Sequence, residues 1–204
     1  FIPTQKKIDY LNSLMEVGFD VLDCGSFVSP KAIPQMADSG TVIDEIDKGV
    51  SNTKLSVIVA NYRGAEKALS HQAVDILGFP FSISETFQFR NTNKNQEEAF
   101  KDIKKINQVL ESDGRILNVY FSMAFGNPYG EVWKSAEVDY WAQRFHDIGI
   151  KNILLSDTTG TGSREQIELL FKTIPTKYSG IDFGAHFHNR YEDSYMKLKA
   201  AYDN

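Results

Sequence analysis

The stretch IDFGAHFH, from Ile181 to His188, has the alternating pattern of a β-strand. Successive side chains of a strand point to opposite faces, so every second residue shares a face. The odd-numbered residues from Ile181 to Phe187 then form an apolar face, whereas His186 and His188 lie together on the other face. The stretch therefore predicts a strand that is buried on one side and carries two neighbouring imidazoles on the other.

Two imidazoles in this arrangement are spaced to bind one metal ion. Neutral imidazole is a good ligand for divalent transition metals, and a neighbouring group can orient its second nitrogen. The same spacing fits two buried histidines that only make hydrogen bonds, and His-x-His is a short motif. Spacing alone leaves both interpretations open.

Segments with strand-like patterns alternate with helical periodicity along the whole chain. The strand segments are 19–24, 55–60, 74–83, 116–123, 152–156 and 181–188. The first helical segment can be capped by Thr4 and ended by Gly18, and others follow at 41–48, 64–70, 96–112, 136–148, 164–174 and 191–204. This alternation is typical of βα units with a parallel sheet, an α/β fold.

A doubly wound open sheet and a TIM (β/α)8 barrel both fit this alternation. No Gly-x-Gly-x-x-Gly follows a strand segment, which argues against the open dinucleotide-binding fold. Polar residues follow six strands in succession. In barrels, active sites are built at these carboxyl ends of the strands. Any one of these residues alone could be a helix cap. They are Asp23, Ser26, Asn61, Ser82, Ser84, Ser122, Asn127, Asp157, Thr158, His186 and His188. We therefore predict a TIM (β/α)8 barrel.

Six strands cannot close an eight-stranded barrel, because two unpaired edges and the inner core would be exposed. The sequence opens with Phe1 rather than Met and leads directly into a helix. We expect residues 1–204 to form a single (β/α)8-barrel domain that is incomplete at both ends. The first strand would precede Phe1, and the eighth would follow Asn204.

Composition limits the classes of function. The 204 residues suffice for one sizeable core, and 42% hydrophobic with 24% charged residues is ordinary for a soluble protein. A net charge of −5 argues against nucleic-acid binding. No apolar run approaches the roughly 20 residues that cross a bilayer, so no membrane association is expected. Cys24 is the single cysteine, which excludes an internal disulfide and fits the reducing cytoplasm.

The segment SFVSPKAIPQM, Ser26–Met36, resembles the Ser-Phe-Val-Ser-Pro-Lys-x-x-Pro-Gln-Met segment of 3-hydroxy-3-methylglutaryl-CoA (HMG-CoA) lyases. Residues 124–129, 156–160 and 186–188 resemble that family's Gly-Cys-Pro-Tyr, Gly-Asp-Thr-x-Gly and metal-binding His-x-His segments. The last two motifs are shared with isopropylmalate and homocitrate synthases, so Ser26–Met36 is what indicates the lyase branch. The order of elements is similar to that family's (β/α)8 barrel from its first helix to its seventh.

The resemblance implies a divalent-metal-dependent retro-Claisen lyase that cleaves HMG-CoA to acetyl-CoA and acetoacetate. The reaction removes the proton of a tertiary hydroxyl and stabilises an enolate-like thioester as the carbon–carbon bond breaks. A cation that chelates the hydroxyl and a carboxylate oxygen lowers the pKa of that hydroxyl. Mg²⁺ or Mn²⁺ is the implied cation, and two histidines suit Mn²⁺ because Mg²⁺ alone prefers oxygen ligands.

Residue by residue, the resemblance implies that His186 and His188 are metal ligands. Asp157 and Thr158 would line the pocket near the metal and orient substrate or a ligand. Lys31, in the loop above the site, would contact CoA phosphates, with a solvated lysine of no specific role as the alternative.

Two further catalytic candidates follow the first strand segment. Asp23 matches a family acid but is shorter than the family's Glu, so its contacts would differ. Ser26 would contact substrate or the water shell of the metal.

Several positions depart from the family's pattern. The family's Arg-Asp pair after the first strand, its Asn ligand after the eighth and its loop cysteine have no counterpart in this sequence. Cys24 cannot replace that cysteine, because it lies at the end of a different strand. Asn127 stands in place of a cysteine, Ser156 in place of a glycine and Asn189 in place of an aspartate. With two ligands in the sequence, weak metal binding is expected.

Other functions stay open. A condensing acyl-CoA synthase of the isopropylmalate or homocitrate type would use acetyl-CoA with a 2-oxo acid. A related lyase would act on another 3-hydroxy-acyl-CoA, and a catalytically silent barrel would only bind a ligand. The expected partner molecule is an acyl-CoA substrate, and a homodimer is an allowed assembly.

Overall fold

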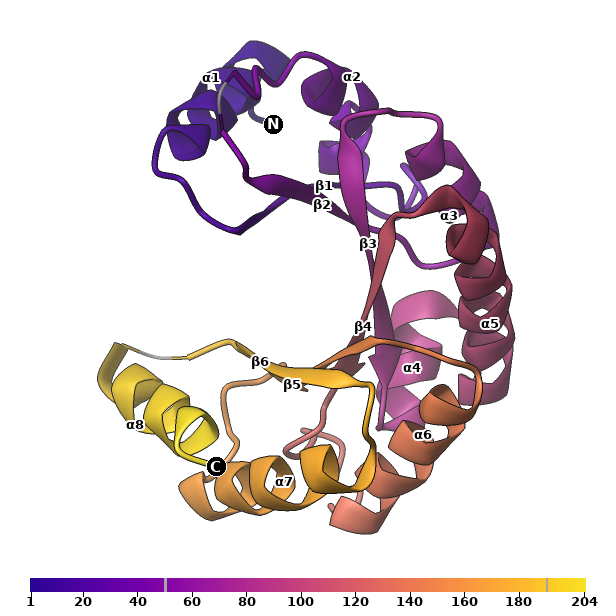
Figure 1. Cartoon of the computed structure of the whole chain (residues 1–204), viewed down its shortest axis with the longest axis vertical. Coiled ribbons are helices and arrows are strands. Elements are labelled where there is room, and N and C mark those ends of the chain that lie inside the picture. The colour runs from indigo at the N-terminus through magenta and orange to yellow at the C-terminus, as the bar shows by residue number, and fades with distance from the viewer. Residues whose placement is uncertain (50, 190) are drawn as a thin grey trace. The chain divides into compact units, whose positions relative to one another are not determined.

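The computed structural model describes residues 1–49, 51–189 and 191–204. Strands alternate with helices, as the sequence predicts (Figure 1). The strands are β1 (Val21–Ser26), β2 (Lys54–Ile58), β3 (Val74–Ser82), β4 (Ile116–Ser122), β5 (Asn152–Asp157) and β6 (Asp182–Phe187). The helices are α1 (Thr4–Met15), the 3-10 helix η1 (Pro34–Met36), α2 (Ser39–Asp44), α3 (Tyr62–Leu69), α4 (Glu85–Thr92), α5 (Gln96–Asp113), α6 (Ser135–Asp147), α7 (Arg164–Lys177) and α8 (Tyr191–Tyr202).

The strands follow one another in the sheet in chain order, from β1 to β6. β2 is parallel to both β1 and β3, and β5 is parallel to both β4 and β6. Parallel strands that are consecutive in the chain need a crossover, which helices supply here. The predicted α/β class with a parallel sheet is confirmed. The register places Ser156 opposite His186 and Asp157 opposite Phe187.

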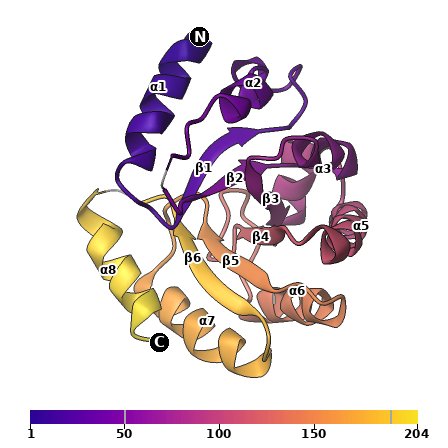
Figure 2. The same cartoon turned by 45° about the horizontal axis from the view of Figure 1, so that its top comes forward.

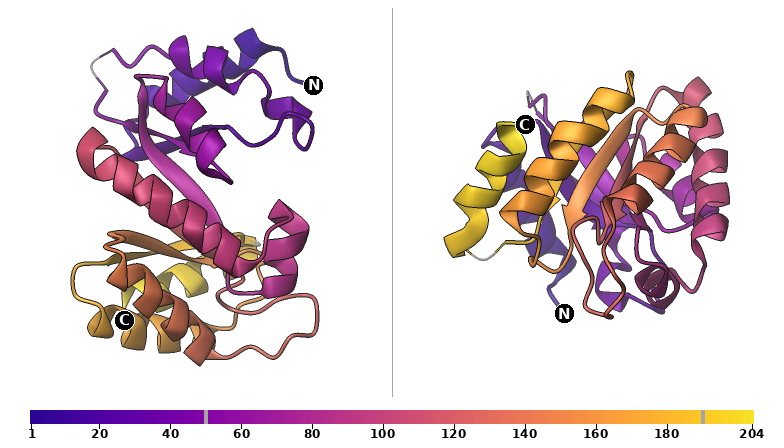
Figure 3. Two further views of the ribbon diagram at one scale, coloured as in Figure 1. Left: turned by 90° about the vertical axis from the view of Figure 1, so that its right-hand side faces the viewer. Right: turned by 90° about the horizontal axis from the view of Figure 1, so that it is seen from below.

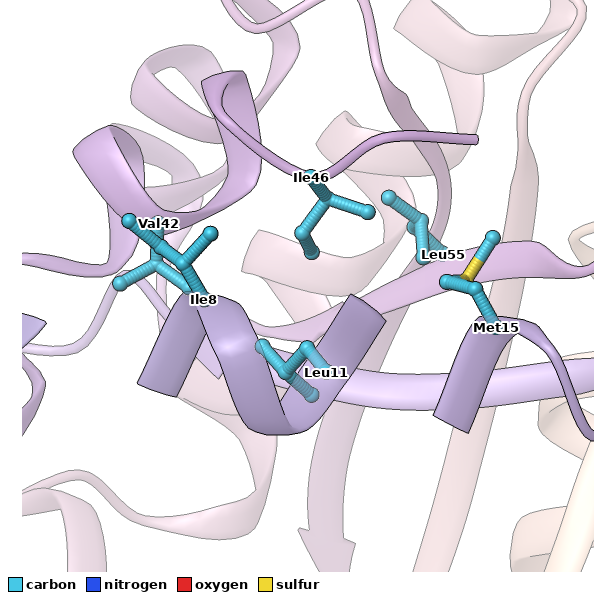
Figure 4. Packing of buried hydrophobic residues seen from close by; sticks show 6 residues of the cluster. All are labelled: Ile8, Leu11, Met15, Val42, Ile46 and Leu55. Atoms are coloured by element: carbon cyan, nitrogen blue, oxygen red, sulfur yellow. The ribbon is translucent and has the colours of Figure 1, made fainter. Parts of the chain in front are cut away.

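Two compact units make up the chain, one of Phe1–Phe79 with Gln108–Leu117 and one of Pro80–Asn107 with Asn118–Asn204. In the first unit, α1 and α2 lie on the same side of β1 and β2 (Figure 1). Apolar residues at helical spacing give α1 one buried face. They pack with residues of α2, the following loop and β2 in a cluster of Ile8, Leu11, Met15, Val42, Ile46 and Leu55 (Figure 4).

In the second unit, α6, α7 and α8 lie side by side and cover β5 and β6 (Figures 2 and 3). The core of this unit is aromatic. Phe145 of α6 is fully buried, and its ring lies between 5.0 and 6.2 Å, centroid to centroid, from those of Phe81, Phe100, Phe121 and Trp141. Aromatic rings at these separations contribute both buried area and favourable edge contacts.

Local details differ from the sequence expectation. Thr4 does not cap α1, because Pro3 occupies the N-cap position and the Thr4 hydroxyl donates instead to the Asp38 carboxylate at 2.7 Å. The helix α4 was not expected, because its apolar residues lack a clear helical stripe. It begins at a side-chain cap, where the Ser84 hydroxyl accepts a hydrogen bond from the Phe87 amide at 3.1 Å.

Every helix among the described residues is too short or too polar to cross a membrane.

We expect Phe145→Ala to lower the free energy of unfolding by about 3–5 kcal/mol, the usual cost of an aromatic-sized cavity. Phe89→Ala is the control, because the Phe89 side chain is 57% exposed. Its effect should stay within about 0.5 kcal/mol. Urea denaturation of the two variants measures the difference, and equal losses would show that the aromatic cluster does not support this unit.

Candidate functional site

The two histidines predicted to bind a metal lie at the end of β6, with their side chains facing each other. Their Nε2 atoms are 3.1 Å apart, and the ring planes meet at 59°. Phe187, between them in the sequence, points the other way and packs edge-on against Phe125. The predicted alternation of side-chain direction is confirmed. The expected burial of the apolar face is not, because Phe183, Ala185 and Phe187 are only half-buried. His188 is exposed and His186 is half-buried, so the alternative of two buried core histidines is wrong.

The separation of the nitrogens fits joint coordination of one cation. Nitrogen ligands at about 2.1 Å from a metal, at right angles to each other, lie about 3 Å apart. The observed 3.1 Å also suits a hydrogen bond between the rings. Among the described residues, no three His, Cys, Asp or Glu side chains gather closely enough to hold a metal. This part of the chain therefore offers two imidazole donors, and the remaining ligands would be oxygens of water or substrate or residues elsewhere.

The His186 ring is oriented from the neighbouring strands. Tyr120 of β4 is buried, and its ring meets that of His186 edge-on at 4.9 Å between centroids. Ser156, opposite His186 in β5, is also buried, and its hydroxyl donates to the Leu154 carbonyl at 3.1 Å. The edge-on contact with Tyr120 therefore limits the orientations open to the His186 ring.

The Asp157 carboxylate, predicted to line the pocket, is only 2% exposed and anchors the turn that follows β5. It accepts hydrogen bonds from the amides of Thr161, at 3.0 Å, and Gly162, at 3.1 Å. It also forms an ion pair with Lys197 of α8, with Nζ at 2.7 Å from Oδ2. The carboxylate is thus occupied by the turn and by a lysine, which fits a role in orienting the site. Its predicted contact with substrate or a ligand stays a prediction.

Lys197 was missed by the sequence analysis. Its side chain is 3% exposed, and Nζ donates to both Asp157 and the Gly160 carbonyl, at 2.7 and 2.8 Å. A lysine in a helix is normally solvated, and its buried partner lies 40 residues away in the sequence. No local pattern could have identified the pair.

The turn touches the backbone of the second histidine directly. Gly160 has a positive φ of +70°, and a Cβ there would lie 2.3 Å from the His188 carbonyl oxygen. The Asp157 carbonyl accepts the His188 amide at 3.2 Å. Only glycine fits this position, so the Gly-containing turn and the end of β6 form one packed structure.

Thr158 holds the same turn to the end of β4. Its hydroxyl accepts a hydrogen bond from the Met123 amide at 2.9 Å. Met123 has a φ of +60°, unusual for a residue with a side chain, and this contact helps to hold it there. The interaction places Thr158 beside the site, while its predicted role toward substrate stays a prediction.

A cavity of about 580 Å³ opens beside this turn. It is lined by Thr159, Gly160, Thr161, Gly162, His188, Asn189, Asp193, Met196 and Lys197. The Asn189 side-chain oxygen is buried and has no hydrogen-bond partner among the residues that the structure describes.

Asn127, the other asparagine that departs from the family pattern, shapes its own loop by accepting from the Tyr129 amide at 2.9 Å.

Asp23, Ser26 and Lys31 belong to the first unit, whereas both histidines belong to the second. Asp23 and Lys31 are exposed. Ser26 is buried, and its hydroxyl accepts a hydrogen bond from the Val28 amide at 3.3 Å at the start of the Pro-containing loop. The structure thus brings together Asp157, Thr158, His186 and His188, and the roles of the other three stay predictions.

Cys24 is not a ready nucleophile. Burial raises the pKa of its thiol to about 12, and the nearby Asp23 carboxylate adds to this effect. The thiol is therefore protonated at neutral pH.

Gly160→Ala should destabilise the protein more than Gly180→Ala. Both glycines have positive φ values, of +70° and +92°, but a Cβ at Gly180 meets nothing within 4 Å. The control should lose about 1–2 kcal/mol from backbone strain alone. Denaturation midpoints measure the difference, and only Gly160→Ala should also weaken Mn²⁺ binding. Equal behaviour of both variants would mean that the turn does not constrain His188.

Comparison with known proteins places these features in a context. Residues 1–194 match the HMGL-like family model. A hydroxymethylglutaryl-CoA lyase of Bacillus subtilis is 30% identical over 191 residues, which are 93% of this chain and 62% of the relative. The mitochondrial hydroxymethylglutaryl-CoA lyase of Mus musculus is 30% identical over 190 residues, covering 93% of this chain and 58% of the relative. The chain therefore spans about six-tenths of the length of these relatives.

Solved structures give the same result for the fold. An HMG-CoA lyase from Acinetobacter baumannii, in complex with coenzyme A and 3-methylmalate, superposes with a TM-score of 0.92 at 30% identity. The match covers 100% of this chain and 66% of that structure. The Bacillus subtilis HMG-CoA lyase structure also gives a TM-score of 0.92, at 27% identity, over 100% of this chain and 67% of that one. The predicted fold, successive βα units of a TIM-type barrel, is confirmed by these matches.

Proposed function

This chain belongs to the HMGL-like family, and from that premise we propose that it acts in metal-dependent retro-Claisen cleavage of HMG-CoA to acetyl-CoA and acetoacetate. The observation that carries the proposal is the His186–His188 pair, whose Nε2 atoms are 3.1 Å apart at the carboxyl end of β6. A site at this end of a parallel strand is where barrels of this type place their chemistry. The relatives named as HMG-CoA lyases supply the substrate class.

The reaction needs a base for the tertiary hydroxyl and a means of stabilising negative charge. When bound, a divalent cation supplies a Lewis acid that chelates the hydroxyl and lowers its pKa. His186 and His188 would hold it through neutral Nε2 atoms, which lie 3.1 Å apart. A base accepts the hydroxyl proton as the bond between the hydroxyl-bearing carbon and the carbon next to the thioester breaks. Acetoacetate leaves with a new ketone, and the enolate takes up one proton to give acetyl-CoA, so that the protons balance.

In our proposal, the residues around the histidines hold the site in place or contact the substrate. Asp157 and Thr158, in our proposal, fix the turn beside His188 and would orient substrate or a ligand from there. In the first unit, we propose Asp23 and Ser26 as polar contacts of the substrate and Lys31 as a contact of CoA phosphates. These three assignments rest on the motif resemblance. Two nitrogen ligands favour Mn²⁺ over Mg²⁺ as the working cation.

The cellular location and the partner molecule are also proposals. We infer that the protein works in the cytoplasm, supported by the single cysteine of the sequence, which excludes an internal disulfide. Its partner molecule is an acyl-CoA, supported by the coenzyme A bound in the Acinetobacter baumannii lyase. The single-domain prediction for residues 1–204, the expected outer strands and the homodimer stay predictions.

The direct test incubates the purified protein with HMG-CoA and Mn²⁺ and measures acetyl-CoA and acetoacetate. We expect both products in equal amounts, loss of turnover after treatment with a chelator, and recovery on adding Mn²⁺. Condensation of acetyl-CoA with a 2-oxo acid, without cleavage of HMG-CoA, would instead indicate the synthase. Absence of both activities in a protein that binds CoA would indicate a silent barrel.

His188→Ala should reduce cleavage by more than about 100-fold, because loss of a direct ligand exceeds the 10–100-fold cost of losing an outer partner. His146→Ala is the matched control, since this histidine is also exposed and lies on α6. Both variants should keep their melting temperature within about 2 °C. Wild-type turnover in His188→Ala would remove this imidazole from the chemistry.

A further inference from the structure

We propose that Lys197 is a positioning residue for the metal site: its ammonium group fixes the turn after β5 and, through that turn, the His188 ligand. The inference rests on the proposed function, since it concerns the same histidine pair. Lys197 itself does not touch the histidine rings in any contact described above. It acts through Asp157 and Gly160.

The first step of the argument is the ion pair. The side chains of Lys197 and Asp157 are 3% and 2% exposed, with 2.7 Å between Nζ and Oδ2. Removing two charges from water is costly, and a buried pair often stabilises a fold less than apolar side chains of the same size would. What the pair does provide is a fixed geometry, because each charged group is held only where its partner is.

The second step is the turn. Asp157 accepts from the Thr161 and Gly162 amides, while Lys197 donates to the Gly160 carbonyl at 2.8 Å. The ammonium therefore contacts the turn at its beginning, through the carboxylate, and at its middle, through the carbonyl. A neutral apolar side chain at this position could fill the space but could satisfy neither oxygen.

The third step is the contact with the ligand. Gly160 packs so closely on His188 that a Cβ would lie 2.3 Å from the His188 carbonyl oxygen. The His188 amide donates to the Asp157 carbonyl at 3.2 Å. A shift of the turn must therefore move the backbone of His188, and with it the 3.1 Å spacing of the two Nε2 atoms. This coupling joins α8 to the metal site.

A lysine that merely joins α8 to the sheet would affect stability alone, so the test measures metal affinity in folded protein. Mn²⁺ is titrated into the full chain, and free Mn²⁺ is followed by electron paramagnetic resonance, without CoA. Lys197→Met should weaken Mn²⁺ binding by about 10–100-fold, the range found when groups that orient a ligand are removed. Lys199→Met is the matched control, because Lys199 lies on the same helix and pairs with Asp203 at the surface. Its Mn²⁺ affinity should stay within about twofold of wild type.

A second variant covers the case in which Lys197→Met fails to fold. Lys197→Met combined with Asp157→Leu removes both buried charges together, and replacing a buried ion pair by apolar side chains is often neutral or stabilising. Circular dichroism verifies the fold, and Mn²⁺ binding should still be weakened by about tenfold or more. Wild-type affinity in either folded variant would overturn the proposal and leave Lys197 as a structural bridge.

The outcomes separate this inference from the proposed function. Loss of Mn²⁺ affinity in the Lys197 variants, in a protein that does not cleave HMG-CoA, would support the positioning role and contradict the lyase. Cleavage by the wild type with unchanged affinity in the variants would contradict the positioning role alone. A wild-type protein that binds no Mn²⁺ would contradict both.

Discussion

The site in the second unit depends on the hydrogen bonds and the ion pair of the buried Asp157 carboxylate. It lies at the last position of β5, accepts hydrogen bonds from the turn that follows, and pairs with Lys197 of α8. Its backbone carbonyl accepts the amide of His188. One residue thus joins a strand, a turn, a helix and a candidate metal ligand. Because both members of the ion pair are buried, neither can leave without exposing an unpaired charge to an apolar interior.

Parallel strand pairing explains why the functional groups gather where they do. The carboxyl ends of β4, β5 and β6 lie at one edge of the sheet, so Met123, Thr158 and His188 come from consecutive crossovers and still meet at the same turn. Because side chains two residues apart on a strand share a face, both imidazoles point the same way. Glycine at position 160 lets the turn approach the strand backbone more closely than any other residue would allow.

The polar side chains at this edge of the sheet have two different roles, although all of them follow strand ends. Asp157 and Thr158 direct their side chains to backbone amides of the site itself, whereas His186 and His188 direct theirs to each other. The carboxylate and the hydroxyl therefore hold the backbone of the site, and the imidazoles are the groups that would bind a cation in the proposed function. A site that is held in place before binding would lose little entropy on binding the proposed cation and substrate.

The sequence by itself determined the alternation of strands and helices, the two faces of Ile181–His188 and the family motif of Ser26–Met36. These follow from local periodicity and from short-range spacing, which a single sequence contains in full. Only the tertiary structure decided that Pro3 rather than Thr4 occupies the N-cap position of α1, that Glu85–Thr92 is a helix, and that Lys197 is buried against Asp157. The first and the last of these depend on a partner brought near by folding: Asp38 for Thr4, and a carboxylate 40 residues away for Lys197. Burial of a charge is decided by such distant partners, so no local pattern could have revealed it.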